Sequence, residues 1–440
     1  TDPKEADVFL HIAMKVAKNC RYVEPQFTLR FDKETSEEIW DEALDALGAG
    51  ATYPTLYNDD VNVPAVMYGM RVDEKTAEQY VPFGCTEFVI QGQSTGTPNI
   101  CINLLKLLTI YMNDGIDPID GKRKSGPVPL KKLEEYQTFE EFYDGYKALL
   151  DYYLDLSVKA QYHSYEVMNQ HVSFLFTSLL TDDCIARGKA LLDGGVRYLG
   201  GTNETYGNIN TSDSLWVIRD LVFNQKKYTL RQLNDAMLAN FNGYEALRKD
   251  CLNCDKYGND LETADTMAND LYEFVAKGVR NRGIAIGMQY FLIVISNNQL
   301  NTEWGNRTAA SPDGRLSCMY MNPANNPQGG ANKSGPTAML NSLAKFDAKY
   351  HGGSVQNIKF SPSMFNENRA VIKSLFKTYF AKGGCHLMVT VVDKGVLEDA
   401  VEHPENYPDL IVRVSGFSAV FVDLSPNIQQ ELLSRVLYDK

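Results

Sequence analysis

The sequence predicts an α/β fold, because short apolar runs of strand length alternate with longer segments of helical periodicity. The run at residues 386–392 is too continuously apolar for a half-exposed strand and is typical of one buried on both faces. Thr35 with Glu38, and Thr138 with Glu141, have the spacing of helix capping boxes. The 440 residues can hold two or three ordinary domains or one large α/β assembly.

In the first half of the chain, we expect helices to dominate after one early strand. The helix that starts near Thr35 ends where Gly48 and Gly50 can take left-handed conformations. The helix that starts at Thr138 is long, because its apolar residues recur at helical spacing toward Leu180. The expected elements are helix 9–20, strand 25–31, helix 35–48, helix 103–111, a loop rich in glycine and proline at 113–129, and helix 139–180.

In the second half, strands become more frequent toward the C-terminus. Residues 304–335 are polar and rich in asparagine, glycine and proline, which predicts a long loop. The expected elements are loop 200–208, helices 212–223, 230–251 and 261–279, strand 355–360, helix 366–381, strand 386–392, helix 396–402, a hairpin around residue 416 and a closing helix at 427–438.

The net charge of −13 excludes one broad class of function. An acidic chain offers no electrostatic attraction to phosphates, so we expect no nucleic-acid partner. The chain has no apolar run of 18 or more residues, so we expect no membrane partner, and it opens with no secretory signal pattern. We therefore expect a cytoplasmic protein that acts on a small-molecule substrate.

Residues 410–419, with the sequence Leu-Ile-Val-Arg-Val-Ser-Gly-Phe-Ser-Ala, are the most informative stretch. Gly416 separates two apolar runs, which predicts two short strands joined by a tight turn. The string closely resembles the signature of the glycyl radical enzymes, Arg-Val-(Ser/Ala)-Gly-(Tyr/Phe)-(Ser/Ala). The resemblance implies a post-translational glycyl radical on Gly416, with no bound metal or organic cofactor in this chain. Glycine suits that role, since a Cα radical is delocalised over both flanking peptide groups and a Cβ would crowd the flattened backbone.

A backbone radical needs a relay to reach a substrate, and a cysteine thiol suits the task because its S–H bond and the glycine Cα–H bond are close in strength. Of eight cysteines, Cys85 is the candidate. Gly84-Cys85-Thr86-Glu87 resembles the Gly-Cys-Val-Glu loop of the dehydratase-type members, with threonine where they commonly carry valine. In an extended loop, residues 85 and 87 point the same way. The resemblance therefore implies that Glu87 removes a proton from the substrate, a role favoured by a pKa raised through burial.

The same resemblance implies a ten-stranded α/β barrel surrounded by helices, with this chain carrying roughly its C-terminal half. Residues 1–310 would form the barrel and helical region with the Cys85 loop, and residues 311–440 the glycyl radical domain, continuous with the same barrel. The implied partners are a radical-SAM activating enzyme with a 4Fe-4S cluster and S-adenosylmethionine, and the N-terminal half of the barrel, on the same precursor or on another chain. A homodimer is also implied.

We expect a lyase or dehydratase that eliminates water or another leaving group from a small hydroxylated substrate. An acyl-transferring enzyme of the pyruvate formate-lyase kind is disfavoured, because Cys85 has no adjacent cysteine. Two alternatives stay open: a radical decarboxylase of arylacetates, and a non-catalytic radical-bearing subunit that completes a split enzyme.

Some features depart from the family pattern or carry no site. Asn99 stands in the region where many dehydratases have an aspartate, and residues 200–208 differ from the family's segment there. Cys251 and Cys254 form a lone Cys-x-x-Cys without a second pair at zinc-site spacing, and the adjacent Cys385 and His386 are an equally weak metal pair. We therefore expect no metal site.

Overall fold

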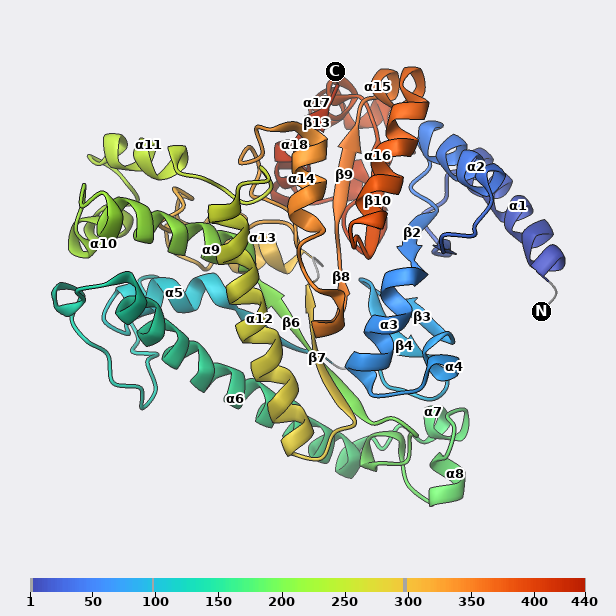
Figure 1. The fold of residues 1–440 in the computed structure, drawn as a ribbon, viewed down its shortest axis with the longest axis horizontal. Helices are drawn as coiled ribbons and strands as arrows, with labels where there is room; N and C mark the ends of the chain where they lie inside the picture. The colour runs from blue at the N-terminus through green and yellow to red at the C-terminus, as the bar shows by residue number, and fades with distance from the viewer. Residues whose placement is uncertain (1–2, 97–98, 296–298, 440) are drawn as a thin grey trace.

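Helices and strands alternate along the chain in the computed structural model, which describes residues 3–96, 99–295 and 299–439 (Figure 1). Within these residues, the strands form a five-stranded sheet, a four-stranded sheet and two two-stranded hairpins. Helices flank the sheets, and one large hydrophobic core runs from the N-terminal helices to the C-terminal strands. The α/β class predicted from the sequence is confirmed.

The N-terminal part carries two hairpin strands after a helix-rich start. Its elements are α1 (Pro3–Cys20), β1 (Thr28–Phe31), α2 (Glu37–Gly48), β2 (Thr55–Asn58), α3 (Asp59–Met70), α4 (Glu74–Ala77), β3 (Tyr80–Phe83) and β4 (Glu87–Ile90). The cap of α2 is Ser36, whose hydroxyl accepts from the Ile39 N–H, one residue after the expected Thr35.

The middle of the chain is dominated by long helices that flank a sheet. Its elements are β5 (Ile100–Asn103), α5 (Leu104–Met112), α6 (Phe139–His171), α7 (Leu175–Leu179), α8 (Cys184–Arg187), β6 (Gly200–Tyr206), α9 (Asn208–Val217), α10 (Leu230–Leu238), α11 (Glu245–Asn253), α12 (Glu262–Ala285) and β7 (Tyr290–Ile295). Thr138 caps α6 as expected. The helix ends at His171 rather than near Leu180, because Ser173 and Phe174 adopt left-handed conformations.

The C-terminal part returns to short strands and helices. Its elements are α13 (Leu300–Gly305), α14 (Gly335–Leu343), β8 (His351–Ser354), β9 (Asn357–Phe360), α15 (Pro362–Glu367), α16 (Arg369–Ala381), β10 (His386–Val391), α17 (Lys394–Glu402), β11 (Ile411–Arg413), β12 (Ser418–Val420), α18 (Pro426–Ser434) and β13 (Leu437–Tyr438). The expected closing helix is therefore too long, since α18 ends at Ser434 and β13 pairs with β9.

The two larger sheets are joined by one extended segment, residues 351–360. Its first half, β8, pairs with β7 in the parallel order β5-β6-β7-β8, and its second half, β9, pairs with β10 in the order β1-β2-β10-β9-β13. Strands β5 and β6 are parallel to β7, whereas β10 is antiparallel to β2. The outer strands of both sheets have no further strand partner within the described residues. The described part of the chain therefore contains two connected open sheets rather than a closed barrel.

The expected loop at 200–208 is wrong, because residues 200–206 form the buried strand β6. Gly200 and Gly201 do not form a turn; they allow close packing of β6 against aromatic rings of β7. A Cβ on Gly200 would lie 2.2 Å from the Tyr290 ring, and one on Gly201 would lie 2.7 Å from the Phe291 ring. Glycine in a strand often marks such a close approach.

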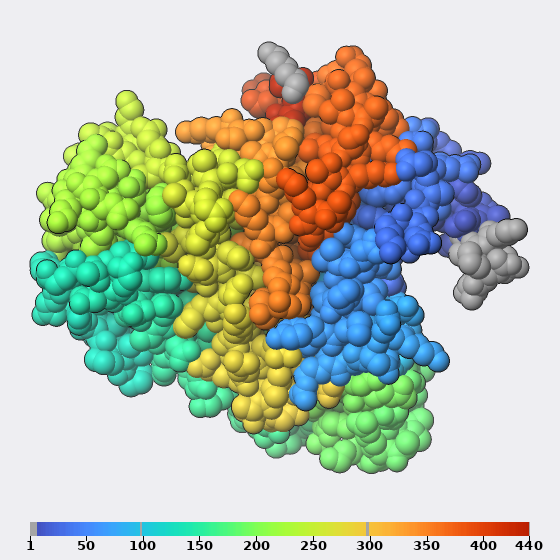
Figure 2. Space-filling view, viewed as in Figure 1, coloured from blue at the N-terminus to red at the C-terminus, as the bar shows by residue number. Residues whose placement is uncertain are grey.

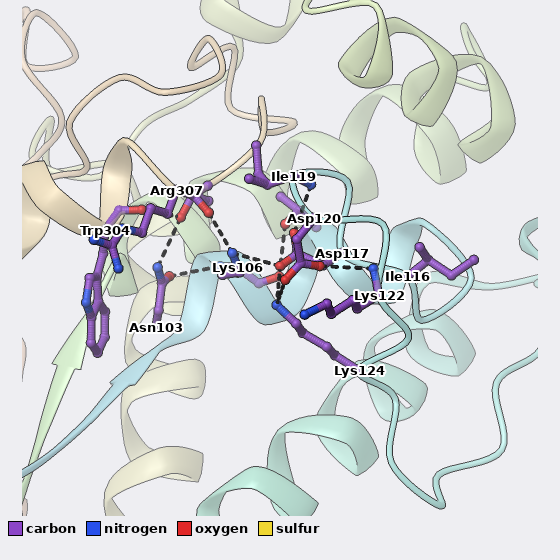
Figure 3. A network of polar contacts seen from close by, with 12 residues as sticks. Asn103, Lys106, Ile116, Asp117, Ile119, Asp120, Lys122, Lys124, Trp304 and Arg307 are labelled. Carbon is purple, nitrogen blue, oxygen red and sulfur yellow. Dashed lines mark hydrogen bonds and ion pairs between the residues drawn. The ribbon is translucent and has the colours of Figure 1, made fainter.

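The expected loop at 113–129 is confirmed, and it is fastened to α5 by a buried charge (Figure 3). Asp117 accepts from the Nζ atoms of Lys106, at 2.8 Å, and Lys124, at 2.5 Å. A buried carboxylate between two ammonium groups is compensated, so it can hold an irregular segment in place.

The N-terminal helix α2 packs beside α16 on one side of the molecule, where the blue and orange segments adjoin (Figure 2). Lys373 and Lys377 of α16 both pair with Glu37 of α2. Every helix in the described part of the chain is too short or too polar to cross a membrane. The Gly416 hairpin also contacts the N-terminal part, since Gln26 donates to the Gly416 carbonyl and Ser418 donates to the Thr52 hydroxyl.

Candidate active site

Cys85 lies at the tip of a β-hairpin, in the three residues between β3 and β4. Gly84 and Thr86 on either side of it have positive φ values of +55° and +89°, and a β-branched residue rarely adopts this conformation. The tip rests on β8, since a Cβ on Gly353 would lie 2.2 Å from the Thr86 carbonyl oxygen. The strained tip is therefore held by a contact that only glycine permits.

Gly416 lies at the tip of a second hairpin, between β11 and β12, as the sequence predicts. The glycine is buried, and its carbonyl oxygen accepts a hydrogen bond from Gln26 Nε2 at 2.9 Å. The turn is held by two arginines: Arg413 Nε donates to the Ser415 carbonyl at 2.6 Å, and Arg435 donates to the Val414 carbonyl at 2.6 Å. Charged donors on backbone carbonyls form strong hydrogen bonds, so this turn has a defined position.

The two hairpin tips meet. A Cβ built on Gly416 would lie 2.3 Å from the Cα and 2.6 Å from the Sγ of Cys85. Because a Cα–Cβ bond is about 1.5 Å long, the Gly416 Cα lies within about 4 Å of that sulfur. The Cα–H bond in this direction points at Cys85. The geometry suits direct transfer of a hydrogen atom between the two residues and excludes any side chain at position 416.

The Cys85 thiol is protonated at neutral pH. Burial, together with the nearby carboxylates of Glu87 and Glu204, raises its pKa to about 12. A thiol that keeps its proton is a donor of hydrogen atoms rather than a thiolate nucleophile.

Glu87 begins β4 and is buried, with 4% of its surface exposed. Its Oε1 accepts from Asn99 Nδ2 at 3.3 Å, whereas its buried Oε2 has no hydrogen-bond partner among the described residues. Burial, and to a smaller extent the charge of Glu204, raises the pKa of Glu87 to about 7. A carboxyl group with this pKa can take up and return a proton near neutral pH.

Glu204 and Asn99 belong to the same cluster, although Glu204 was not predicted from the sequence as a site residue. Asn99 Nδ2 donates to Glu204 Oε1 at 2.7 Å as well as to Glu87. The missed signal is the alternation Thr202, Glu204, Tyr206 in residues 200–206, which places three polar side chains on one face of a strand. Because a loop was expected at residues 200–208, this strand-like alternation was not used.

Two weaker cysteine motifs lie elsewhere in the sequence. Cys251 is buried in α11 and Cys254 caps that helix, while the Cys385 Sγ lies 3.9 Å from His351 Nε2. Across residues 3–96, 99–295 and 299–439, no three histidine, cysteine, aspartate or glutamate side chains are grouped so as to hold a metal ion.

Two protein-family models match the chain. Residues 4–300 match the model described as pyruvate formate lyase-like, and residues 321–422, which include Gly416, match the model described as glycine radical. The domain boundary predicted at residue 310 falls between these matches and stays a prediction.

Individual relatives agree with the family models. The chain is 30% identical over 428 residues to trans-4-hydroxy-L-proline dehydratase of Clostridioides difficile, which covers 97% of this chain and 54% of the relative. It is 26% identical over 480 residues to the 4-hydroxyphenylacetate decarboxylase glycyl radical subunit of Clostridioides difficile strain CD196, covering 97% of this chain and 52% of the relative.

Among solved structures, the glycerol-bound form of the B12-independent glycerol dehydratase from Clostridium butyricum is similar in fold. Its TM-score is 0.91 at 28% sequence identity, covering 98% of this chain and 55% of that chain. The chain thus spans about half the length of the relatives that it matches.

Proposed function

Because this chain belongs to the pyruvate formate lyase-like family of glycyl radical enzymes, we propose that it carries the radical and proton-transfer groups of a dehydratase-type carbon–oxygen lyase. The observation that carries the proposal is the contact between Gly416 and Cys85, in which the position of a Gly416 side chain falls 2.6 Å from the sulfur. Burial of Gly416 supports the same role, since a backbone radical must be shielded from water and dioxygen.

In the proposed reaction, the Gly416 Cα radical takes the hydrogen atom of the Cys85 S–H group. The resulting thiyl radical takes a hydrogen atom from a substrate carbon that bears a hydroxyl group. Glu87 removes the proton of that hydroxyl, and the ketyl radical anion expels the hydroxyl group on the neighbouring carbon, which leaves as water with the proton from Glu87. Cys85 then returns a hydrogen atom to the product radical, which becomes a carbonyl compound.

Glu87 is suited to this double role by its pKa of about 7, which burial raises. A base whose pKa lies near the working pH is ionised often enough to accept a proton and acidic enough to return it. Its buried Oε2, which has no partner within the described residues, is the atom available to the substrate.

A radical decarboxylase is the second candidate, supported by the similarity to the 4-hydroxyphenylacetate decarboxylase subunit. The dehydratase is favoured because relatives of that name match at higher identity, 30% and 28%. The two candidates differ in product: a dehydratase converts a diol or related alcohol into a carbonyl compound, whereas a decarboxylase releases carbon dioxide from an arylacetate.

We propose three partners beyond the small-molecule substrate. A radical-SAM activating enzyme, with its 4Fe-4S cluster and S-adenosylmethionine, would abstract the Gly416 hydrogen after the hairpin swings out. A segment that corresponds to the unmatched half of the relatives would complete the barrel and the substrate pocket. A second copy of the protein would complete a homodimer.

The test is electron paramagnetic resonance of the complete protein, kept anaerobic and treated with an activating enzyme, S-adenosylmethionine and a reductant. We expect a doublet signal in wild type and in Cys85→Ser, and no signal in Gly416→Ala. Turnover should be lost in Cys85→Ser. A radical signal that persists in Gly416→Ala would place the radical elsewhere and overturn the assignment.

Product analysis then separates the candidates. Carbonyl products from diols or amino alcohols support the dehydratase. Carbon dioxide from arylacetates, without carbonyl products, would replace it with the decarboxylase. A radical signal with neither product would favour the radical-bearing subunit without catalysis.

A further inference from the structure

The amide of Asn99 bridges two buried carboxylates. Its nitrogen donates to Glu87 Oε1 at 3.3 Å and to Glu204 Oε1 at 2.7 Å, and its oxygen accepts from the hydroxyl of Thr202. An ionised carboxylate only accepts hydrogen bonds, so the nitrogen of the amide must face the two glutamates. Both amide hydrogens are then in use, and the orientation of Asn99 is settled by its neighbours.

Glu204 is held more firmly than Glu87. Its Oε2 accepts from the Tyr206 hydroxyl at 2.5 Å and lies 3.8 Å from the Cys101 thiol, in addition to the Asn99 bond at Oε1. Cys101 is the cross-strand partner of Glu204 in the β5–β6 ladder, and Tyr206 is two residues along the same strand. The carboxylate is therefore fixed by side chains that belong to a buried sheet.

Glu87 has one side-chain hydrogen bond, and the backbone N–H groups of Cys85 and Glu87 also act on its carboxyl group and lower its pKa. Asn99 fixes Oε1, while Oε2 is buried and has no hydrogen-bond partner in the part of the chain that the structure describes. The position of a Cβ on Gly84 falls 3.2 Å from Oε2, so this oxygen lies over the hairpin tip that carries Cys85. The two oxygens of the carboxyl group thus have different surroundings: Oε1 is bonded to Asn99, and Oε2 faces the hairpin tip.

The charged and titratable groups around Glu87 come from several elements. Glu204 on β6 raises the pKa of Glu87, and Cys85 and Tyr57 are kept protonated by raised pKa values. Burial lowers the pKa of His351 on β8 to about 4, so it is neutral at pH 7. Arg413 is cationic, but it donates to the Ser415 carbonyl and Ser418 hydroxyl. Glu204 is therefore the neighbour whose charge acts on Glu87 with the same sign.

We propose that Glu204 is a positioning residue for Glu87: through the shared Asn99 amide it anchors Oε1 and leaves Oε2 to accept the substrate proton. This inference rests on the proposed role of Glu87 as the base. In this proposal Glu204 acts through Asn99 and exchanges no proton with the substrate. The charge of Glu204 disfavours ionisation of Glu87. Its hydrogen bond with Asn99 also limits how strongly the Asn99 amide can stabilise the ionised form of Glu87.

The test measures the titration of Glu87 directly, so it needs neither radical nor substrate. Infrared difference spectra of the complete protein with ¹³C-labelled glutamate, recorded from pH 4 to 9, follow the carboxyl bands, and Glu87→Gln identifies the Glu87 band. We expect Glu204→Gln to lower the Glu87 midpoint by on the order of one pH unit. The matched control is Asp265→Asn, which removes a buried carboxylate that pairs with Lys345 and should leave the midpoint unchanged.

An unchanged or raised midpoint in Glu204→Gln would overturn the proposal. Tyr206→Phe provides a second variant in case Glu204→Gln does not fold. It removes the hydroxyl group that donates to Glu204 Oε2. We expect the Glu87 midpoint to move in the same direction as in Glu204→Gln, to lower pH, by a smaller amount. An unmoved midpoint there, with a folded protein, would also count against the proposal.

Activity then links the positioning role to the reaction. In the activated enzyme, the acidic limb of the pH profile of kcat/KM should move to lower pH in Glu204→Gln, in step with the Glu87 midpoint. If the midpoint shifts while wild type forms no radical, the positioning role stands and the proposed function fails. If the radical forms while the midpoint does not shift, the proposed function stands and the role of Glu204 fails.

Discussion

Gly416 packs directly against Cys85: a Cβ at position 416 would lie 2.3 Å from the Cys85 Cα and 2.6 Å from its Sγ. Contacts this short require the hairpins to separate, and the atoms involved include backbone. The lack of a side chain at residue 416 is therefore a requirement of packing as well as of radical chemistry. The same contact explains why two segments from distant parts of the chain form one site.

We predict that Gly416→Ala destabilises the protein by about 1–3 kcal/mol, because an added methyl group in a tightly packed site forces the backbone to move. Thermal unfolding measures the loss, and the radical signal should disappear. Ser415→Ala is the matched control, since its buried Oγ has no hydrogen-bond partner among the described residues. Equal destabilisation by both variants would contradict the contact.

The pKa of Glu87 makes stability depend on pH. Burial raises this pKa to about 7, whereas a glutamate in the unfolded chain titrates near about 4.3. Between these values the folded state binds more protons than the unfolded state, so the Glu87 contribution favours folding at low pH and is lost as the pH rises toward 7. Glu87→Gln removes this dependence.

We therefore predict that Glu87→Gln and wild type have similar stability at pH 4, and that the variant is more stable at pH 8 by up to about 3 kcal/mol. Denaturant unfolding of both proteins at the two pH values gives the difference. Asp213, whose pKa burial also raises to about 7, is present in both proteins and cancels. A difference that does not change with pH would show that Glu87 titrates normally.

Arg413 fixes the Gly416 turn from inside the protein. It is 2% exposed, its guanidinium lies 5.3 Å from the Tyr53 ring centroid, and it donates to Ser415 and Ser418. We predict that Arg413→Lys loses about 2–3 kcal/mol, because an ammonium group cannot reproduce the fork of donors and leaves a buried carbonyl unsatisfied. Hydrogen exchange at residues 414–417 should become faster.

Arg369→Lys is the control for that change. Arg369 pairs with Asp45 at the surface, where such pairs contribute about 0–1 kcal/mol. A small loss in Arg413→Lys, equal to that in the control, would mean that the turn is held mainly by other contacts.

Local signals in the sequence predicted the starts of several helices and the hairpin at Gly416, whereas the expected helix 230–251 is divided into α10 and α11. The hydroxyl of Thr138 marks the start of α6, and Gly416 marks the turn between β11 and β12. Strands that depend on distant partners were harder to predict. Residues 290–295 are continuously apolar and form β7, yet no strand was predicted there, and β6 was taken for a loop because its glycines pack against Tyr290 and Phe291.

In the candidate site too, residues in local motifs could be predicted from the sequence, whereas a residue that depends on distant contacts could not. The family motifs around Gly416, Cys85 and Glu87 lie in contiguous sequence and could be recognised from it, although their roles stay predictions. Glu204 could not, because its importance arises from a hydrogen bond to Asn99 across two strands. A side chain whose role depends on a contact far away in the sequence leaves no local pattern of its own.

The hairpin that carries Cys85 packs against β8 at Gly353. Gly353 has φ +143°, and a Cβ there would lie 2.2 Å from the Thr86 carbonyl oxygen, so an added side chain must push the hairpin tip away. We predict that Gly353→Ala separates Cys85 from Gly416. Radical formation at Gly416 should persist, while turnover falls at least tenfold, because an error of about 1 Å in the position of a reacting group lowers rates steeply.

Gly330→Ala separates this contact from backbone strain. Gly330 also has positive φ, +79°, but nothing lies within 4 Å of its Cβ position. Its replacement should destabilise the protein by about 1 kcal/mol through conformation alone and leave turnover per radical unchanged. Electron paramagnetic resonance quantifies the radical and product assays give the turnover. Equal turnover per radical in Gly353→Ala and Gly330→Ala would show that the position of Cys85 does not depend on the contact between Thr86 and Gly353 of β8.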